Sequence, residues 1–382
     1  MKLTEKFLLF LAVLFAASCT QSTDMLTVIN PDGSCYREFT ADANKQFVVG
    51  DSIEKNNPFP VDIDATCQVI WKFKNSEWFA QFPASKTKVD SIMKAMKGRD
   101  RVDKKKEKSN DFFARLRINY TSVEDMAVRF KLKESHEWSK IKVKYSLYKK
   151  FRWFYTYYTY RETYPKIETE FKIPIEKYVT HDEAMYWFTG VPNIMQGLNG
   201  VEMMEYGNHI ENELRQWFNL NLWNAEYKFL LANYDRMKDK PVSKERLANL
   251  QDTIFNAKVN QAENFKMKHI LDDYFKTDVF TTFWKSNDSQ MEKYEKEFND
   301  QGFVNYFGKT FTYKLVLPGK IIQPNNAIVQ GDTLSWRLTA YRMIPTDFVI
   351  EAQSRKANVW AFILTGILGL VAVSSFIWKP KR

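Results

Sequence analysis

An uncharged stretch near the C-terminus places the strongest constraint on how this chain can fold. Residues 358–378 read Asn-Val-Trp-Ala-Phe-Ile-Leu-Thr-Gly-Ile-Leu-Gly-Leu-Val-Ala-Val-Ser-Ser-Phe-Ile-Trp and carry no ionisable side chain. About 20 apolar residues at helical rise cross the hydrocarbon core of a bilayer. Trp360 and Trp378 lie near the two ends, where interfacial aromatic residues are enriched, and a basic tail, 379–382, follows. The stretch therefore predicts a single transmembrane helix.

The N-terminus has the pattern of an export signal. Two lysines precede the apolar run 7–15, and the small residues 16–18 lead directly to Cys19. A run of small residues that ends at a cysteine resembles the lipobox of bacterial lipoproteins, which implies a lipid on Cys19 as the first mature residue. Ala16 stands where that family usually has leucine. Ordinary signal-peptide cleavage and an uncleaved anchor are the alternatives.

The two ends together predict the topology and the compartment. Export places the body outside the cytoplasm, so the C-terminal helix runs inward and leaves the basic tail in the cytoplasm. A spanning helix belongs to an inner (plasma) membrane, because spanning proteins of outer membranes are closed barrels. The net charge of +10 then suggests affinity for anionic lipid headgroups beside the anchor. Export argues against nucleic acid as the partner.

The chain has three cysteines, and the predicted lipid occupies Cys19. Cys35 and Cys67 remain as an even pair in an oxidising compartment, where disulfides form and persist. Bridging requires Cα atoms within about 7 Å of each other, which the sequence alone does not establish. The two residues are therefore a candidate disulfide, and two free thiols are the alternative.

Hydrophobic periodicity divides the body into three blocks. The first alternates apolar and polar residues, as half-buried strands do, and the second repeats apolar residues every three to four positions, as helices do. Helix caps are predicted at Thr180, which begins a capping box with Glu183, and at Asn208 and Ser243. Strand-like runs of the first block include 113–120, 125–132, 141–150 and 151–163.

These blocks predict an α+β fold, with an antiparallel β-rich extracytoplasmic domain that a helical block interrupts and with one C-terminal transmembrane helix. The predicted parts are a signal peptide (1–18), a lipidated tether (19–25), a first β-rich part (26–179), a helical insertion (180–300), returning strands (301–354), the transmembrane helix (358–378) and a basic tail (379–382).

Two surface features have alternative interpretations. The aromatic row at 151–163 is typical of the packed face of a long strand, although such rings also stack on sugars or nucleobases. The basic run 97–108 is expected to be a solvated loop, and the alternative is a patch that binds anionic lipid or cell-wall polymer.

The sequence offers little support for catalysis or for a bound cofactor. None of the four histidines stands in a metal-binding motif, a phosphate-binding glycine loop is absent, and no spacing selects two carboxylates as acid and base. We therefore expect no catalytic, cofactor or metal residues. In the predicted transmembrane helix, Thr365 and Gly369 form a small-x-x-x-small pair that favours close packing against another helix.

The strands that precede the predicted membrane helix carry a family resemblance. Leu317-Pro-Gly-Lys-Ile321, Gly331-Asp-Thr-Leu-Ser-Trp-Arg-Leu338 and Glu351-Ala352, followed at once by the helix and basic tail, are similar to the C-terminal part of LppM-like bacterial lipoproteins. The resemblance implies a lipidated, membrane-tethered binding or envelope module without a catalytic residue. The helical block at 180–300 departs from the family pattern.

These observations lead to three functional hypotheses. The first is a non-catalytic envelope lipoprotein, anchored at both ends, whose body binds an envelope protein or lipid. The second is an accessory subunit of a membrane protein complex, for which an exposed apolar face on the helical block would be the sign. The third is a cell-wall glycan hydrolase, which would need a cleft with paired carboxylates.

Overall fold

The computed structural model describes residues 21–377 except for 75, 98–111, 168–170, 261, 263–264 and 287–308. The predicted signal peptide, Cys19 and nearly all of the basic run 97–108 lie outside the described residues. The chain divides into two compact units. Among the described residues, the β unit comprises those within 21–165, 309–339 and 348–377, and the helical unit those within 166–308 and 340–347.

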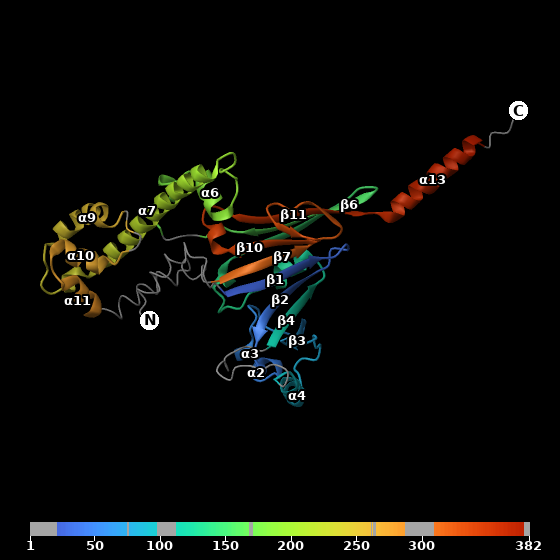
Figure 1. Cartoon of the computed structure of the whole chain (residues 1–382), viewed down its shortest axis with the longest axis horizontal. Coiled ribbons are helices and arrows are strands. Elements are labelled where there is room, and N and C mark those ends of the chain that lie inside the picture. The colour runs from blue at the N-terminus through green and yellow to red at the C-terminus, as the bar shows by residue number, and fades with distance from the viewer. Residues whose placement is uncertain are drawn as a thin grey trace. The chain divides into compact units, whose positions relative to one another are not determined.

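The larger sheet of the β unit has seven strands in the order β3-β4-β2-β1-β7-β10-β9. β1 and β7 run parallel, whereas the other neighbours are antiparallel (Figure 1). The predicted wholly antiparallel sheet is therefore wrong at this pair, and the sheet is mixed. The strands are β1 (Gln21–Ile29), β2 (Cys35–Ala43), β3 (Cys67–Phe73), β4 (Phe112–Tyr120), β7 (Lys309–Val316), β9 (Ile328–Gln330) and β10 (Thr333–Thr339).

The second sheet of the β unit has four antiparallel strands in the order β5-β6-β11-β8. They are β5 (Lys144–Phe151), β6 (Tyr155–Tyr164), β8 (Lys320–Gln323) and β11 (Phe348–Ala357). Along β6 every second side chain is buried, including Tyr158, Tyr160 and Tyr164. The packing interpretation of the aromatic row is thus confirmed for these three rings.

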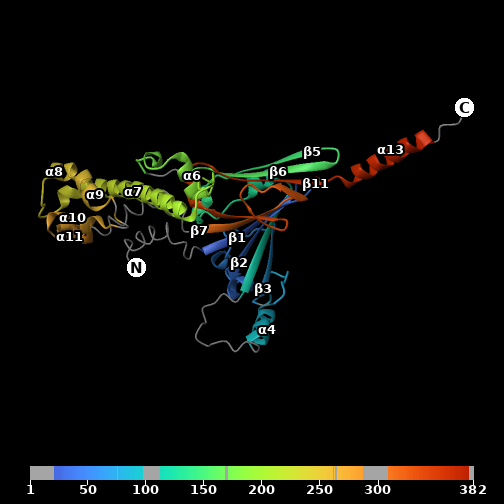
Figure 2. The same ribbon diagram turned by 45° about the horizontal axis from the view of Figure 1, so that its top comes forward.

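The two sheets of the β unit face each other. Arg37 of β2 and Tyr313 of β7, both in the seven-stranded sheet, contact Glu162 of β6 in the other sheet. Figure 2 shows β5, β6 and β11 lying together across the strands of the larger sheet. Alternating strands bury one face each, so the core lies between the sheets, where a buried polar group needs a partner.

Short helices and an irregular segment complete the β unit. The predicted strand at 125–132 is wrong, because residues 123–129 form α5, whose first turn is capped by the Ser122 side chain accepting from the Asp125 amide. The sequence carries that cap signal, but the apolar alternation obscured it. The helices are α2 (Lys45–Val48), α3 (Ile53–Asn56), α4 (Lys86–Lys97), α5 (Val123–Arg129) and the 3-10 turn η1 (Glu137–Lys140).

The helical unit contains one long helix and several short ones. The capping box of Thr180 with Glu183 and the cap at Ser243 are both confirmed. Asn208 lies inside α7, which Asn199 caps instead. The helices are α6 (His181–Thr189), α7 (Gly200–Asn233), α8 (Lys244–Asn249), α9 (Gln251–Lys258), α10 (Met267–Phe275) and α11 (Val279–Ser286), with the 3-10 turns η2 (Ile175–Lys177), η3 (Tyr234–Arg236) and η5 (Ala340–Met343).

The helical unit has a core of its own. The second half of α7 supplies Trp223, Tyr227 and Leu230, which are fully buried against Leu247 of α8 and Ile254 of α9. Tyr227 donates to the Leu247 carbonyl at 2.7 Å, so its hydroxyl is paired inside the core. The fold class is therefore α+β with a distinct helical block, as the sequence predicts.

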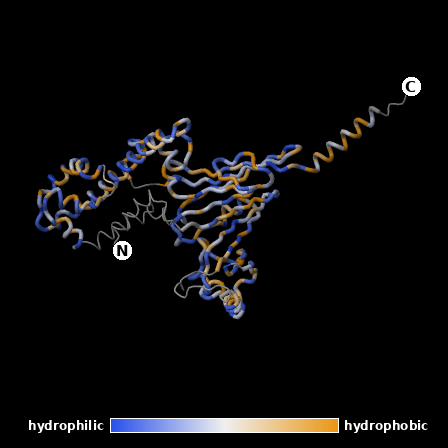
Figure 3. The backbone as a smooth tube through the Cα atoms, in the orientation of Figure 1, coloured by the Kyte–Doolittle hydropathy of each residue, from blue (hydrophilic) through white to orange (hydrophobic). Residues whose placement is uncertain are grey.

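The last helix, α13 (Val359–Ile377), follows β11 after one residue. Figure 3 shows an almost continuous run of apolar residues along it, and most of its described side chains are exposed. Within the described part of the chain, no helix has both the length and the apolarity needed to cross a membrane. The transmembrane helix therefore stays a prediction.

Candidate functional site

A fully buried carboxylate lies at the centre of the β unit. Glu162 of β6 accepts hydrogen bonds from Tyr160 at 2.6 Å, from Tyr164 at 2.7 Å, and from Tyr313 and Arg37. The Arg37 side chain is 1% exposed and the Glu162 side chain is 0% exposed. Such a pair overcomes its desolvation penalty only when the remaining hydrogen-bonding capacity is also used. The three tyrosines meet that requirement for Glu162.

Arg37 has its own set of partners. Its Nε donates to Thr27 at 3.1 Å, one terminal nitrogen donates to Tyr145 at 3.4 Å and the other to Glu162. The guanidinium also lies 4.5 Å from the centroid of the Phe130 ring. Because aromatic faces attract desolvated cations, Phe130 stabilises the charge while covering it.

The tyrosines of this network are held in their neutral form. Burial, and then the negative charge of Glu162, raises the pKa of Tyr160, Tyr164 and Tyr313 well above the ordinary value of 10. Burial raises the pKa of Tyr145 to about 12. These hydroxyls therefore remain donors, and the network is suited to structural support rather than to proton transfer near neutral pH.

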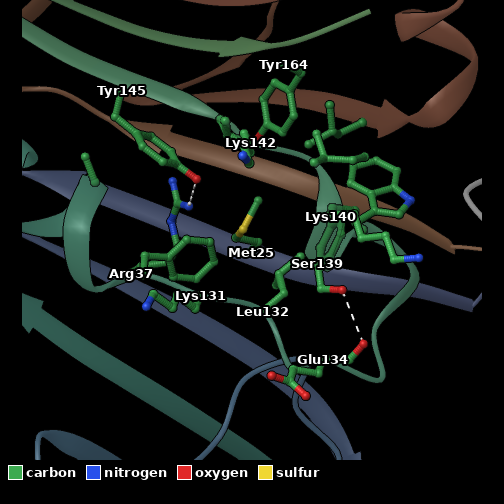
Figure 4. Close-up of a pocket in the computed structure, with 17 residues that line it drawn as sticks. Met25, Arg37, Lys131, Leu132, Glu134, Ser139, Lys140, Lys142, Tyr145 and Tyr164 are labelled. Carbon is green, nitrogen blue, oxygen red and sulfur yellow. Dashed lines mark hydrogen bonds between the residues drawn. The ribbon is translucent and has the colours of Figure 1, made fainter. Parts of the chain in front are cut away.

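A cavity of about 720 Å³ lies beside this network. Figure 4 shows its lining, with Arg37 and Tyr145 at one end and Lys140 at the other. Its volume is within the roughly 300–1,000 Å³ of pockets that bind small molecules. The lining residues are Met25, Arg37, Ala127, Phe130, Lys131, Leu132, Glu134, Trp138, Ser139, Lys140, Ile141, Lys142, Val143, Tyr145, Tyr164, Phe311 and Leu338.

The floor and the rim of the cavity differ in chemistry. The floor consists of buried, largely apolar side chains, including Met25 of β1, Phe311 of β7 and Leu338 of β10. The rim comes from the irregular segment 130–143 and carries the exposed Lys131, Lys140 and Lys142 against one exposed carboxylate, Glu134. A molecule with an apolar part and an anionic group matches this distribution.

The rim segment is anchored to the larger sheet by aromatic contacts. Trp138 packs edge-on against Phe311 at 5.2 Å between ring centroids, and His136 lies 5.6 Å from the same ring. Burial lowers the pKa of His136, whose Nδ1 accepts from the Trp138 amide at 3.1 Å. The imidazole is therefore neutral and serves as a cap of η1. These contacts hold one wall of the cavity in place without a regular strand.

The candidate disulfide is not formed. Cys35 and Cys67 are both free thiols. Cys35 lies on β2 opposite Tyr120, and Cys67 lies on β3 opposite Ile118, so β4 separates them. Two strand spacings amount to roughly 9–10 Å, which exceeds the reach of a disulfide. Burial raises the pKa of Cys35 to about 11, so it is an inert core thiol.

The two residues of the predicted helix-packing pair, Thr365 and Gly369, have different surroundings. Thr365 donates to the Ala361 carbonyl at 2.7 Å and accepts from the Trp153 indole at 2.8 Å, so the β5–β6 hairpin already contacts it. Nothing lies within 4 Å of a Cβ placed at Gly369. Packing of a partner helix against this pair stays a prediction, as does lipidation of Cys19, which lies outside the described residues.

The described residues offer no cluster of three or more potential metal ligands. Among the described lining residues of the cavity, Glu134 is the one carboxyl group, so this cavity does not present the carboxylate pair that glycan hydrolysis needs. Sequence reasoning missed the cavity altogether. Its residues come from eight separate elements and segments, and the spacing of lysines at 140 and 142 next to apolar residues was the one local signal.

Comparison of the chain with protein-family models, with curated proteins and with solved structures finds no significant match. The resemblance to LppM-like lipoproteins therefore stays a prediction.

Proposed function

We propose that this chain is a non-catalytic envelope lipoprotein whose β unit binds an amphipathic anionic molecule, such as a membrane lipid, in the cavity beside Arg37 and Glu162. In this proposal a lipid on Cys19 and a membrane helix over 358–378 anchor the two ends. The observation that carries the binding role is the pairing of an apolar floor with a lysine-bearing rim. The uncharged run 358–378 and the signal-like N-terminus support the anchors.

The cavity suits such a ligand for two physical reasons. Transfer of an acyl chain from water onto the apolar floor contributes roughly 25 cal/mol for each square ångström that is buried. The rim lysines add attraction for a phosphate or carboxylate at the exposed end of the ligand, where their ammonium groups remain hydrated. The Arg37–Glu162 network keeps the two sheets at a fixed spacing beside the cavity, so the site is preorganised.

The first experiment is to purify the chain from its own membrane, extract it with organic solvent and identify bound lipids by mass spectrometry. Ala127→Trp places a large side chain in the lining, and Val128→Trp places the same side chain on an exposed neighbour outside it. We expect Ala127→Trp to lower the amount of co-purified lipid about tenfold, equivalent to roughly 1.4 kcal/mol, and Val128→Trp to leave it unchanged.

The charge of the rim is tested with a second matched pair. Lys142→Glu reverses a charge in the lining, and Lys144→Glu reverses an exposed charge two residues away that does not line the cavity. We expect only Lys142→Glu to reduce binding of an anionic lipid. Equal losses in both variants would indicate a general surface attraction, and absence of any bound amphiphile from the parent protein would contradict the proposal.

One observation favours an accessory subunit of a membrane complex as a second candidate. The first turns of α7 expose Val201, Met203 and Met204, which have no role in the core of the helical unit. Methionine-rich exposed surfaces are typical of adaptable protein contacts. The size of the native protein in mild detergent, with co-migrating chains identified by mass spectrometry, separates this candidate from the first. A stoichiometric partner lost in Met204→Glu would favour it.

A further inference from the structure

The β5–β6 hairpin ends in an unusual turn. Arg152 and Tyr155 exchange backbone hydrogen bonds at 2.8 and 3.2 Å, which leaves Trp153 and Phe154 as a two-residue loop. Hairpin loops of two residues often use asparagine, aspartate or glycine because many such turns need positive φ angles. Neither Trp153 nor Phe154 has a positive φ, so this turn admits many residue types and does not itself call for aromatic ones. Two large aromatic residues in the loop are therefore not explained by the demands of the turn.

Asn358 joins this hairpin tip to the beginning of α13. Its amide nitrogen donates to the Arg152 carbonyl at 2.8 Å and to the Trp153 carbonyl at 3.1 Å, and its backbone N–H donates to the Phe154 carbonyl at 2.9 Å. Its side-chain oxygen accepts from the Thr156 hydroxyl at 2.9 Å. One residue thus satisfies three consecutive carbonyls of the tip, and the first turn of the helix is fixed to the hairpin.

Aromatic rings of the tip and of α13 pack on one another. Phe151 lies parallel to Trp360 at 6.3 Å between centroids, and Trp153 meets the same indole edge-on at 5.3 Å. Phe154 packs against Phe362 at 4.7 Å. We call these five rings the aromatic collar. Figures 1 and 2 show α13 leaving the β unit beside the end of β6, where the collar lies.

The collar stays exposed despite these contacts. Its five side chains are between 38% and 57% exposed, so each ring contacts a neighbouring ring and still presents part of its surface to its surroundings. These clustered rings therefore leave apolar surface in contact with solvent, which folded proteins seldom do without a binding partner. A surface of this kind is typical of a contact with another phase or molecule.

The two segments that form the collar carry basic residues and no acidic ones. No acidic residue occurs between Glu137 and Glu162 or after Glu351. The strands that lead to the collar carry Lys149, Lys150, Arg355 and Lys356, and the turn itself carries Arg152. Juxtamembrane lysine and arginine contribute about 1 kcal/mol each to the attraction for an anionic lipid surface.

We infer that the hairpin tip is a membrane-contact surface, with the aromatic collar at the boundary between headgroups and acyl chains and the basic residues on anionic headgroups of the outer leaflet. Tryptophan favours this boundary because its ring is apolar and its N–H is polar. The inference rests on the proposed function, since the collar is continuous with the uncharged run that is proposed to enter the bilayer. It adds a second membrane contact that fixes the tilt of the β unit on the surface.

The test measures the depth of single positions in a bilayer. The full chain with Cys35→Ala and Cys67→Ala carries one added cysteine at a time, Phe154→Cys in the tip, Ile363→Cys in α13 or Ile328→Cys in β9, labelled with a polarity-sensitive fluorophore. Each protein is reconstituted into phosphatidylcholine vesicles with a minor fraction of phosphatidylglycerol, with and without lipids brominated near the headgroup. The background without an added cysteine reports any signal from Cys19.

We expect a blue shift and loss of fluorescence with brominated lipid at position 154, and neither at position 328. Replacing Trp153 and Phe154 by Asn and Gly keeps a favoured turn and removes two rings, and it should abolish the same response at an added Phe151→Cys label. Quenching at 363 without quenching at 154 overturns the inference and leaves the proposed anchor standing. Quenching at neither 154 nor 363 overturns both the tip contact and the proposed membrane helix. Quenching at 328 equal to that at 154 would show that the membrane contact is not specific to the tip, which also overturns the inference.

Discussion

The two ends of the β5–β6 hairpin reverse the usual distribution of residues. Near one end Glu162, an ionic side chain, is completely buried, while at the other the rings of Phe151, Trp153 and Phe154 are exposed. Most folded domains bury aromatic rings and expose carboxylates, so each end needs its own explanation. The buried end is explained inside the molecule, because Arg37 and three tyrosines complete the hydrogen bonds of Glu162. The exposed end lacks an explanation within the described protein surface.

The two ends of the hairpin should respond differently to substitution. All hydrogen bonds of the buried Glu162 are made within the protein, so its removal should lower stability. The exposed aromatic cluster has part of its apolar surface uncovered, so its removal should weaken binding and leave stability nearly unchanged. Substitutions at the two ends separate these expectations.

Removing the buried carboxylate should have the largest effect on stability. Glu162→Ala leaves Arg37 buried without its counter-charge, and we expect a loss of about 3–5 kcal/mol in the free energy of unfolding. Urea denaturation of the detergent-solubilised chain measures it. The double variant Arg37→Met, Glu162→Leu removes both charges and should recover much of this loss. If Glu162→Ala unfolds at the parent's urea concentration, the buried pair does not support the fold.

The tyrosine network predicts a decline in stability at alkaline pH. In the unfolded chain Tyr160, Tyr164 and Tyr313 ionise near pH 10, whereas in the folded state their raised pKa keeps them protonated. Their contribution is complete below pH 10 and is lost as the pH rises, because the unfolded state then binds fewer protons than the folded state. Each contributes a slope of about 1.4 kcal/mol per pH unit.

Comparison of variants isolates this slope from the titration of lysines. We expect Tyr313→Phe to be less stable than the parent by about 1–3 kcal/mol at pH 8, because Glu162 loses a donor, and to lose stability less steeply above pH 10. Tyr148→Phe removes an exposed hydroxyl outside the network and serves as the control. Equal slopes in all three proteins, from urea denaturation at several pH values, would exclude the network as the source.

The hydrogen bonds between the hairpin tip and α13 should contribute less to the free energy of unfolding than the buried network does. Asn358→Ala removes the side-chain hydrogen bonds to the hairpin tip, and we expect a loss of about 1 kcal/mol because these groups are near solvent. Hydrogen–deuterium exchange should increase in the first turn of α13 and in the turn at 152–155, with no change in β2. Increased exchange throughout the β unit would show instead that the joint supports the whole core.

The smallest effect is expected for an exposed ion pair between β6 and β11. Glu351 of β11 pairs with Arg161 of β6, where the side chains are 22% and 55% exposed. Glu351→Gln should cost less than about 1 kcal/mol, and added salt should remove the difference. A loss comparable to that of Glu162→Ala, measured by the same denaturation, would remove the contrast between the buried and the exposed ion pair of β6.

Features that depend on neighbours in the sequence were predictable. Thr180 with Glu183 and Ser243 cap helices through contacts that span three residues, so the residue types reveal them. Alternation predicted β4 and most of β6, because a half-buried strand repeats every two residues. The error at 125–132 arose where a short helix also alternates, and the cap at Ser122 was the better signal.

Features that join distant parts of the chain were not predictable. Arg37 and Glu162 are 125 residues apart, and the sequence around each of them gives no sign that they form a buried pair. The parallel pairing of β1 with β7 joins residues 21–28 to 309–316, and a single sequence holds no record of which strands are adjacent. The cavity depends on this pairing, since Met25 and Phe311 of its floor come from those two strands.

The pairing of β1 with β7 also sets an order for folding. β1 lies between β2 and β7 in the sheet, so one of its edges stays open until residues beyond 308 are available. The core of the helical unit lies within residues 223–284 and can form before that point, whereas residues 340–347 join the unit later. In a chain that emerges from its N-terminus, the insertion therefore folds first and the sheet closes last. Sheet closure joins very distant residues, which makes it the slow step of assembly.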